Sequence, residues 1–118
     1  MANFNAWGQD ATRGAHVFRK CAVCHTVDPS APLKLAPPLG GIIGRRAASI
    51  PGYEYSESMK EAGTSGLVWT KDALNFFLDR PDTFMPGTYM TFAGLELAER
   101  QDVIAYLETL SKSAGSTP

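Results

Sequence analysis

The sequence has no long apolar run and no large excess of charge of one sign. No stretch approaches the ~20 apolar residues of a membrane-spanning helix, and residues 1–5 have neither the basic start nor the apolar run of a signal peptide. The net charge is -1, which gives no indication of a nucleic-acid partner. Regular β alternation and internal repeats are also absent, and the 118 residues suit one domain.

Cysteine is scarce, and both cysteines lie in the run Cys21-Ala22-Val23-Cys24-His25. C-x-x-C-H is typical of c-type haem attachment. Its two thiols can add to the haem vinyl groups, and the adjacent histidine can bind the iron. The alternatives are a thioredoxin-like pair, a disulfide or a zinc site. A thioredoxin-like pair should lie near a βαβ pattern, which is absent, and only His16 remains as a further zinc ligand. The motif therefore predicts one covalently attached haem c with its iron.

Short helices separated by long loops are predicted along the chain. The helical segments are an Asp10-capped helix that runs into the motif, 56–62 with a stop at Gly63, 71–80 capped by Thr70, and about 95–111. Proline and glycine make loops of 26–52 and 81–93. We expect residues 1–9 to be an N-terminal extension or linker, 10–112 to be the haem domain and 113–118 to be a flexible tail. The predicted fold is all-α, with about four short helices around the haem, because such helices need something large to pack against.

The iron of a haem at this site needs either a sixth ligand or an open position. His16 lies beside the attachment site on the first helix, where we expect a surface role. Met59, Met85 and Met90 are the thioether candidates, although methionine in a short chain is usually core filler. Met90 is favoured because the irregular loop around it is unsuited to ordinary packing. Thioether ligation raises the potential of the iron and favours electron transfer.

From about Gly14 to Leu110 the chain resembles the class I c-type cytochromes, in particular mitochondrial cytochrome c and bacterial cytochrome c2. The shared features are Cys-x-x-Cys-His, the later Pro-Gly-Thr-x-Met-x-Phe-Ala-Gly and an aromatic-containing last helix. The resemblance implies the class I cytochrome c fold and one-electron transport through a His/Met-ligated haem, rather than an enzyme. Two alternatives stay open. The chain could be an electron-entry domain of a membrane-anchored or multi-domain redox protein, or a haem enzyme or ligand sensor with a labile Met90.

The resemblance also implies a role for each matching residue. Cys21 and Cys24 bind the vinyl groups, His25 and Met90 are the axial iron ligands, and the Pro37 carbonyl orients His25. The other implied cofactor-binding residues are Arg45, Tyr55, Trp69 and Thr88 at the propionates, Phe92 over the haem edge, and Phe77 and Leu78 near the methionine. Plain core packing remains the alternative for Tyr55, Trp69 and Phe92, and a solvated side chain for Arg45. Where the first and last helices cross, Gly14 and Phe18 are expected to meet Val103, Tyr106 and Leu107.

The chain departs from the mitochondrial group in polarity and charge. Phe77 stands where that group has a tyrosine and Met59 where it has an asparagine. Lysines surround the exposed haem edge in that group. Here the matching segments carry Asp79, Asp82 and Glu96, with Arg19, Lys20 and Arg80 as the nearby basic residues. We therefore expect redox partners, such as a membrane oxidase or reductase, to be met through modest charge and apolar contact, or through a membrane tether.

These features also predict where the protein works. Haem attachment to C-x-x-C-H takes place outside the bacterial cytoplasm or in the mitochondrial intermembrane space. We expect the bacterial periplasm, with a role in a respiratory chain, ahead of the mitochondrial compartment. A signal peptide or an N-terminal membrane anchor would then belong to a longer precursor. We expect a monomer without a nucleic-acid partner or small-molecule substrate.

Overall fold

The computed structural model describes residues 10–22, 25–28, 36–90 and 92–115. In chain order its elements are α2 (Ala11–Val17), the 3-10 helix η1 (Phe18–Lys20), α3 (Glu57–Thr64), α4 (Lys71–Asp79), α5 (Pro81–Phe84) and α6 (Leu97–Gly115). The described residues form no strand, and their β pairing is an isolated antiparallel bridge between Arg46 and Val68. The prediction of an all-α fold is confirmed.

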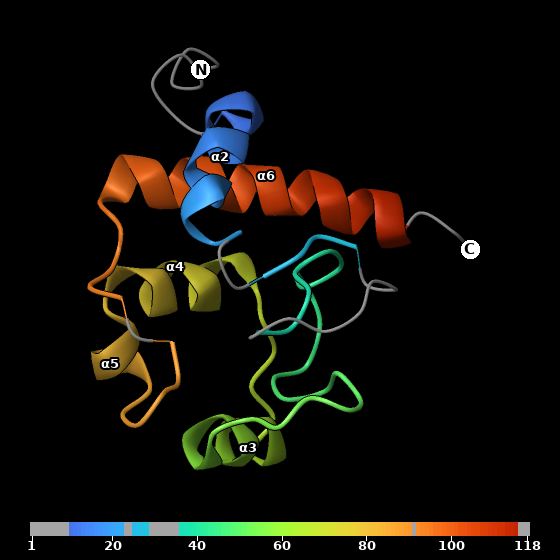
Figure 1. The fold of residues 1–118 in the computed structure, drawn as a ribbon, viewed down its shortest axis with the longest axis vertical. Helices are drawn as coiled ribbons and strands as arrows, with labels where there is room; N and C mark the ends of the chain where they lie inside the picture. The colour runs from blue at the N-terminus through green and yellow to red at the C-terminus, as the bar shows by residue number, and fades with distance from the viewer. Residues whose placement is uncertain (1–9, 23–24, 29–35, 91, 116–118) are drawn as a thin grey trace.

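The crossing of α2 over α6 joins the two ends of the domain (Figure 1). Asp10 caps α2, as predicted, because its carboxylate accepts a hydrogen bond from the Arg13 amide at 2.9 Å. The buried Asp102 carboxylate of α6 accepts from the Asp10 amide at 2.9 Å and from Arg13 Nε at 2.9 Å. A single carboxylate on α6 thus holds both the start of α2 and its first turn.

Gly14 lets the two helices approach closely. A Cβ atom at this position would lie 1.9 Å from the Asp102 carbonyl oxygen and 2.8 Å from Tyr106 Cβ. Phe18 packs on Tyr106 with the ring centroids 5.5 Å apart. The predicted meeting of Gly14 and Phe18 with this face of α6 is therefore present.

Hydroxyl caps begin the two middle helices: Thr70 is the predicted cap, and Ser56, predicted as the first residue of its helix, is the cap of that helix. Ser56 Oγ accepts from the Met59 amide and Thr70 Oγ1 from the Ala73 amide, both at 3.1 Å. The helix that begins after Ser56 does not stop at Gly63, however, but continues to Thr64. Gly63 serves close packing instead, because a Cβ there would lie 2.3 Å from the Ala47 carbonyl oxygen.

Two boundaries after residue 80 differ from the prediction. Residues 81–84, predicted as loop, form α5, because a proline is tolerated at the first position of a helix, where its missing N–H has no helical partner. The last helix begins at Leu97 rather than about Leu95 and ends at Gly115 rather than Ser111, so the start of the predicted tail is helical.

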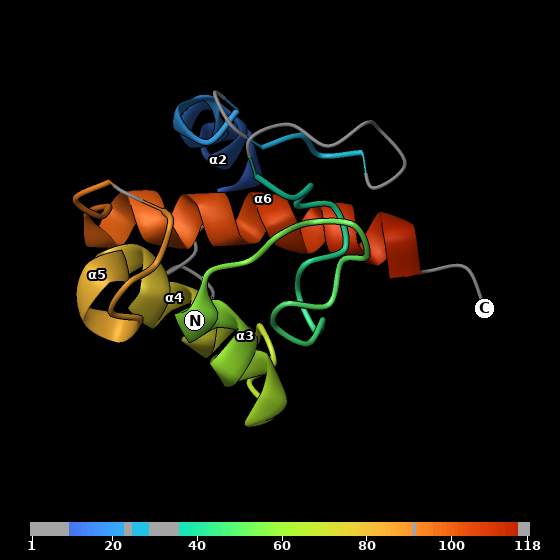
Figure 2. The same cartoon turned by 60° about the horizontal axis from the view of Figure 1, so that its bottom comes forward.

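The core extends from the crossing of α2 and α6 to α4 and the neighbouring loops. α2 crosses α6 in Figure 1, and Figure 2 shows α2 and α4 on opposite sides of α6; in both views α3 lies at the far end from α2. The core side chains come from helices and loops alike and include Phe18, Ile42, Trp69, Leu74, Phe77, Leu78, Met85, Leu95, Val103, Ile104 and Leu107. Within the described residues, no helix combines the length and apolar character needed to cross a membrane.

We predict that Gly14→Ala lowers the free energy of unfolding by about 2–3 kcal/mol, because the added methyl group meets the α6 backbone, which cannot rotate away. At an ordinary helical site the same change would stabilise by up to about 1 kcal/mol. Denaturant unfolding followed by circular dichroism measures the effect. Ala15→Gly, on the exposed face of α2, is the control and should cost about 1 kcal/mol from helix propensity alone. A Gly14→Ala protein as stable as the wild type would contradict the close crossing.

Candidate functional site

Cys21 and Ala22 continue the first helical region as a turn. The amides of Cys21 and Ala22 both donate to the Phe18 carbonyl, at 2.7 and 2.9 Å, and the His25 amide donates to the Cys21 carbonyl at 2.8 Å. This last bond joins residues four apart, so His25 lies about one helical turn after Cys21. Burial raises the pKa of the half-buried Cys21 thiol. Cys24, the second predicted attachment residue, lies outside the described residues.

The ring of His25 is held by the loop that follows it. Its Nδ1 lies 2.5 Å from the Pro37 carbonyl oxygen. A carbonyl can only accept, so Nδ1 carries the proton and Nε2 carries the lone pair. The loop is closed by the Leu39 amide, which donates to the Thr26 carbonyl at 2.8 Å. The imidazole thus has the tautomer and the fixed orientation that a metal ligand requires.

Three of the predicted propionate residues lie together around one loop. Backbone hydrogen bonds of 2.9 Å, from Gly44 to the Trp69 carbonyl and from Trp69 to the Arg45 carbonyl, bring Arg45 and Trp69 side by side. Tyr55 Oη accepts from the Ile50 amide at 3.0 Å. Burial raises the pKa of Tyr55, so its hydroxyl stays protonated at neutral pH and can donate.

The methionine loop combines one buried and one half-buried methionine. Met85 is 4% exposed and belongs to the core, whereas Met90 is half-buried and packs against the core edge. Thr88 shapes the loop: its amide donates to the Met85 carbonyl at 3.0 Å, and its Oγ1 accepts from the Met90 amide at 3.1 Å. The half-buried Phe92 follows, also against the core.

An aromatic cluster of Trp69, Phe77 and Phe84 lies next to this loop. The ring centroids of Trp69 and Phe77 are 5.2 Å apart, and those of Phe77 and Phe84 are 6.0 Å apart. Leu78 is buried beside Phe77 on α4, and its carbonyl accepts from the Leu95 amide at 2.9 Å. The cluster therefore links α4 and α5 to both ends of the loop that carries Met90.

Ion pairs offset most of the basic residues expected near the haem edge. Lys20 Nζ lies 2.8 Å from Glu99 Oε2, and Arg80 Nε lies 3.8 Å from Asp82 Oδ1. Lys20 holds the pKa of Glu99 below its usual range. Two of the three basic residues expected near the haem edge are thus paired with acidic side chains. His16 is exposed on α2, in line with the surface role expected for it.

Three residues that the sequence did not indicate hold the elements and side chains of the site in place: Ser49, Arg100 and Asp102. Asp102 ties α2 to α6, and Ser49 binds Arg45. Arg100, whose side chain is 12% exposed, donates to Asn75 Oδ1 at 2.9 Å and to the Leu95 carbonyl at 2.8 Å. A charged residue directly before Val103 was the only signal for Asp102, and nothing in the sequence marks Arg100 or Ser49.

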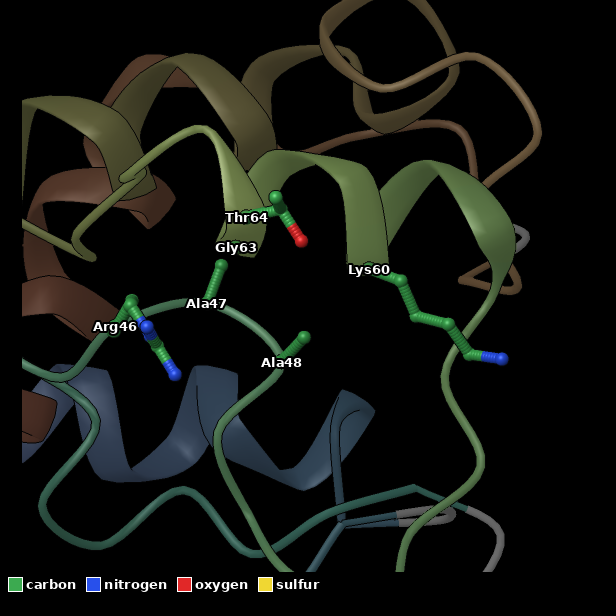
Figure 3. Close-up of a pocket in the computed structure, with 6 residues that line it drawn as sticks. All are labelled: Arg46, Ala47, Ala48, Lys60, Gly63 and Thr64. Carbon is green, nitrogen blue, oxygen red and sulfur yellow. The ribbon is translucent and has the colours of Figure 1, made fainter.

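A hollow of about 230 Å³ lies between α3 and residues 46–48. Figure 3 shows its lining residues, Arg46, Ala47, Ala48, Lys60, Gly63 and Thr64. None of the predicted site residues lines it. Lys60 at its edge is paired with Glu54 at 2.9 Å and Glu57 at 3.5 Å. The hollow is therefore a feature separate from the candidate site.

Comparison with known proteins places the chain in a family. The cytochrome c family model matches residues 11–111. The chain is 46% identical to cytochrome c-550 of Ancylobacter novellus, with 84% of this chain and 94% of that protein covered. It is 44% identical to cytochrome c2 of Agrobacterium tumefaciens (83% and 89% covered). Cytochrome cH from Methylobacterium extorquens superposes with a TM-score of 0.76 at 34% identity, covering 85% of this chain and 98% of that one.

The chain therefore belongs to the cytochrome c family and has the class I cytochrome c fold. As a member it carries one covalently bound haem c and is an electron carrier, not an enzyme. The residues fit this group. An oriented imidazole lies one turn from a half-buried thiol, and hydrogen-bond donors gather at Arg45 and Tyr55. The apolar side chains of the core supply the dry surroundings.

We predict that Tyr55→Phe lowers the free energy of unfolding of the haem-containing protein by about 1 kcal/mol, because the Ile50 amide loses its acceptor. Denaturant unfolding provides the measurement. Tyr89→Phe is the matched control: Tyr89 is 64% exposed, and its loss of a hydroxyl should change stability by less than about 0.5 kcal/mol. Equal stability of the two variants would show that the bond between Tyr55 and Ile50 contributes nothing.

Proposed function

We propose that the protein transfers single electrons between larger redox proteins through a haem iron ligated by His25 and Met90. The observation that carries this proposal is the 2.5 Å contact between His25 Nδ1 and the Pro37 carbonyl oxygen. That contact fixes the tautomer in which Nε2 carries the lone pair that a metal ligand needs, and it restrains the ring. A restrained ligand moves little when the iron changes charge, so little reorganisation accompanies electron transfer.

The other site residues hold and shield the cofactor in this proposal. Haem c supplies a one-electron ferric/ferrous couple when bound. Cys21 and Cys24 attach it through their sulfur atoms. The hydrogen-bond donors for the propionates are Arg45, Tyr55, Trp69 and Thr88, and the apolar side chains that keep water away are Phe77, Leu78 and Phe92. Met90 provides the thioether that raises the potential of the iron.

The geometry of the methionine loop favours a carrier over a ligand sensor. A sensor needs a sixth ligand that leaves easily. Here the Met90 amide is bonded to Thr88 Oγ1, and Thr88 is bonded to the buried Met85. The loop is further supported by Leu95, which α4 binds through the Leu78 carbonyl. Such restraints favour a Met90 that stays in place in both oxidation states.

The pairing of two of the three basic residues near the edge favours partners that bind through apolar contact. Lys20 and Arg80 are offset by Glu99 and Asp82, and the 64% exposed Tyr89 stands next to Met90. Long-range steering by a basic face is therefore weak. A membrane oxidase or reductase complex is the partner class that we propose, reached by diffusion or through a tether that raises the local concentration.

We place this activity in the bacterial periplasm and in a respiratory chain. Haem attachment to C-x-x-C-H proceeds outside the bacterial cytoplasm. Relatives named cytochrome c-550 and cytochrome c2 in Ancylobacter novellus and Agrobacterium tumefaciens support a bacterial carrier.

We predict that the wild-type protein gives a low-spin spectrum with the weak far-red sulfur-to-iron band, and that carbon monoxide leaves the reduced spectrum unchanged. Met90→Ala should remove the band, lower the midpoint potential and allow carbon monoxide to bind, because the sixth position opens. Visible spectra of both oxidation states and a redox titration provide the measurements.

Met85→Leu is the control for this experiment. Met85 is 4% exposed in the core, so leucine should preserve both the spectrum and the stability to within about 1.5 kcal/mol. Met59→Leu is the same control for Met59, the remaining thioether candidate. A wild type that binds carbon monoxide readily, or a far-red band that survives in Met90→Ala, would overturn the proposed ligation and favour a sensor or an enzyme.

We also predict that no lysine-ligated form appears at alkaline pH. In the mitochondrial group a lysine of the methionine loop can replace the sulfur, whereas this chain has no lysine between Lys71 and Lys112. Tyr89→Lys should create such a form, because residue 89 is exposed and adjacent to Met90. Magnetic resonance during a pH titration identifies an amine ligand, and finding one in the wild type would contradict the prediction.

A further inference from the structure

We propose that Ser49 is a positioning residue that holds the Arg45 guanidinium in the orientation needed to face a haem propionate. This inference rests on the proposed function, because it takes from it the place of Arg45 beside the haem. It adds a residue to which the motifs and the family resemblance gave no role. It also accounts for the left-handed backbone conformation of Ala48 in the same loop.

Ser49 binds Arg45 through two atoms at once. Arg45 Nε donates to Ser49 Oγ at 2.8 Å, and Arg45 Nη2 donates to the Ser49 carbonyl oxygen at 3.1 Å. Two contacts to one planar guanidinium fix its plane as well as its position. Both residues are half-buried, so water competes less for these bonds than it would at the surface. The remaining N–H groups of Arg45 are left to point in one set of directions.

The backbone before Ser49 is shaped for this contact. Ala48 has a φ of 59°, the only positive φ of a residue other than glycine among the residues described. This left-handed conformation is disfavoured for a side chain with a Cβ atom. It reverses the chain so that both the side chain and the carbonyl of the next residue can turn back toward Arg45. Backbone strain of this kind tends to accumulate at functional sites.

Packing against α3 maintains the strained turn. Ala47 is 1% exposed, its amide donates to the Leu67 carbonyl at 2.9 Å, and its own carbonyl lies against Gly63. Figure 3 shows Ala47 and Ala48 opposite the Gly63 end of α3. The turn is therefore held by contacts outside the haem site, and Arg45 does not depend on the haem for its orientation.

The residue after Ser49 orients the second donor. The Ile50 amide donates to Tyr55 Oη at 3.0 Å, so the lone pair used there directs the phenolic hydrogen elsewhere. Ser49 and Ile50 together set the directions of a cation and a hydroxyl donor that the proposal places at the propionates. A fixed positive charge near the iron favours the reduced state, because the oxidised iron carries one more positive charge. Loosening Arg45 should therefore lower the midpoint potential.

The test compares Ser49→Ala with Ser49→Thr in the intact haem protein. We expect Ser49→Ala to lower the midpoint potential and to speed the exchange of the Arg45 Nε hydrogen with water, as measured by nuclear magnetic resonance. Ser49→Thr keeps the hydroxyl and should restore both values. Ser65→Ala, at the exposed end of α3, is the control and should change neither. Circular dichroism verifies that each variant folds.

Arg45→Gln separates this inference from the proposed function. We expect Arg45→Gln to lower the potential, and Ser49→Ala to lower it no further in that background, since the two act through the same charge. If Arg45→Gln lowers the potential while Ser49→Ala changes neither the potential nor the exchange rate, the positioning role is wrong and the site assignment stands. If Arg45→Gln leaves the potential unchanged, the placement of Arg45 at the haem fails, and the inference fails with it.

Discussion

The close crossing of α2 and α6 is the constraint on which the haem site depends. η1 and Cys21 follow α2 directly, so the place where α2 meets α6 determines where Cys21 lies. The His25 amide donates to the Cys21 carbonyl, which ties His25 to the same crossing. Gly14 permits the approach, and the buried carboxylate of Asp102 ties the two helices at the start of α2. A covalent cofactor needs this, because its attachment residues must be held in one place relative to the residues that approach from the far side of the haem.

Irregular loops rather than helices provide most of the functional geometry. The Pro37 carbonyl sets the tautomer of His25, Ser49 binds Arg45, the Ile50 amide binds Tyr55, and Thr88 shapes the loop at Met90. These partners are either backbone groups or short hydroxyl side chains, which have little freedom of their own. Long loops can therefore be rigid where their hydrogen bonds are local and their ends pack on the core.

Charge is arranged to support the fold more than to attract partners. Arg100 joins α6 to α4 through Asn75 and Asp79, and Lys71 reaches Glu108 of α6 at 3.4 Å. The pair of Lys71 and Glu108 is exposed and contributes little stability on its own, whereas the Arg100 side chain is 12% exposed. Acidic and basic side chains nearly balance over the whole chain, which has a net charge of -1. In the function that we propose, partner specificity comes from shape and apolar contact more than from electrostatic steering.

The sequence by itself determined the helices with clear caps, the cofactor and the family. Asp10, Ser56 and Thr70 begin helices where predicted, because a capping side chain bonds to amides only two or three residues away. C-x-x-C-H indicates haem c for a similar reason, since its chemistry depends on spacing along the chain. Tertiary structure alone decided that α3 passes through Gly63, where it packs against Ala47, and that Met85 is core. These outcomes depend on which segments pack together, and local sequence patterns carry no record of contacts made by distant parts of the chain.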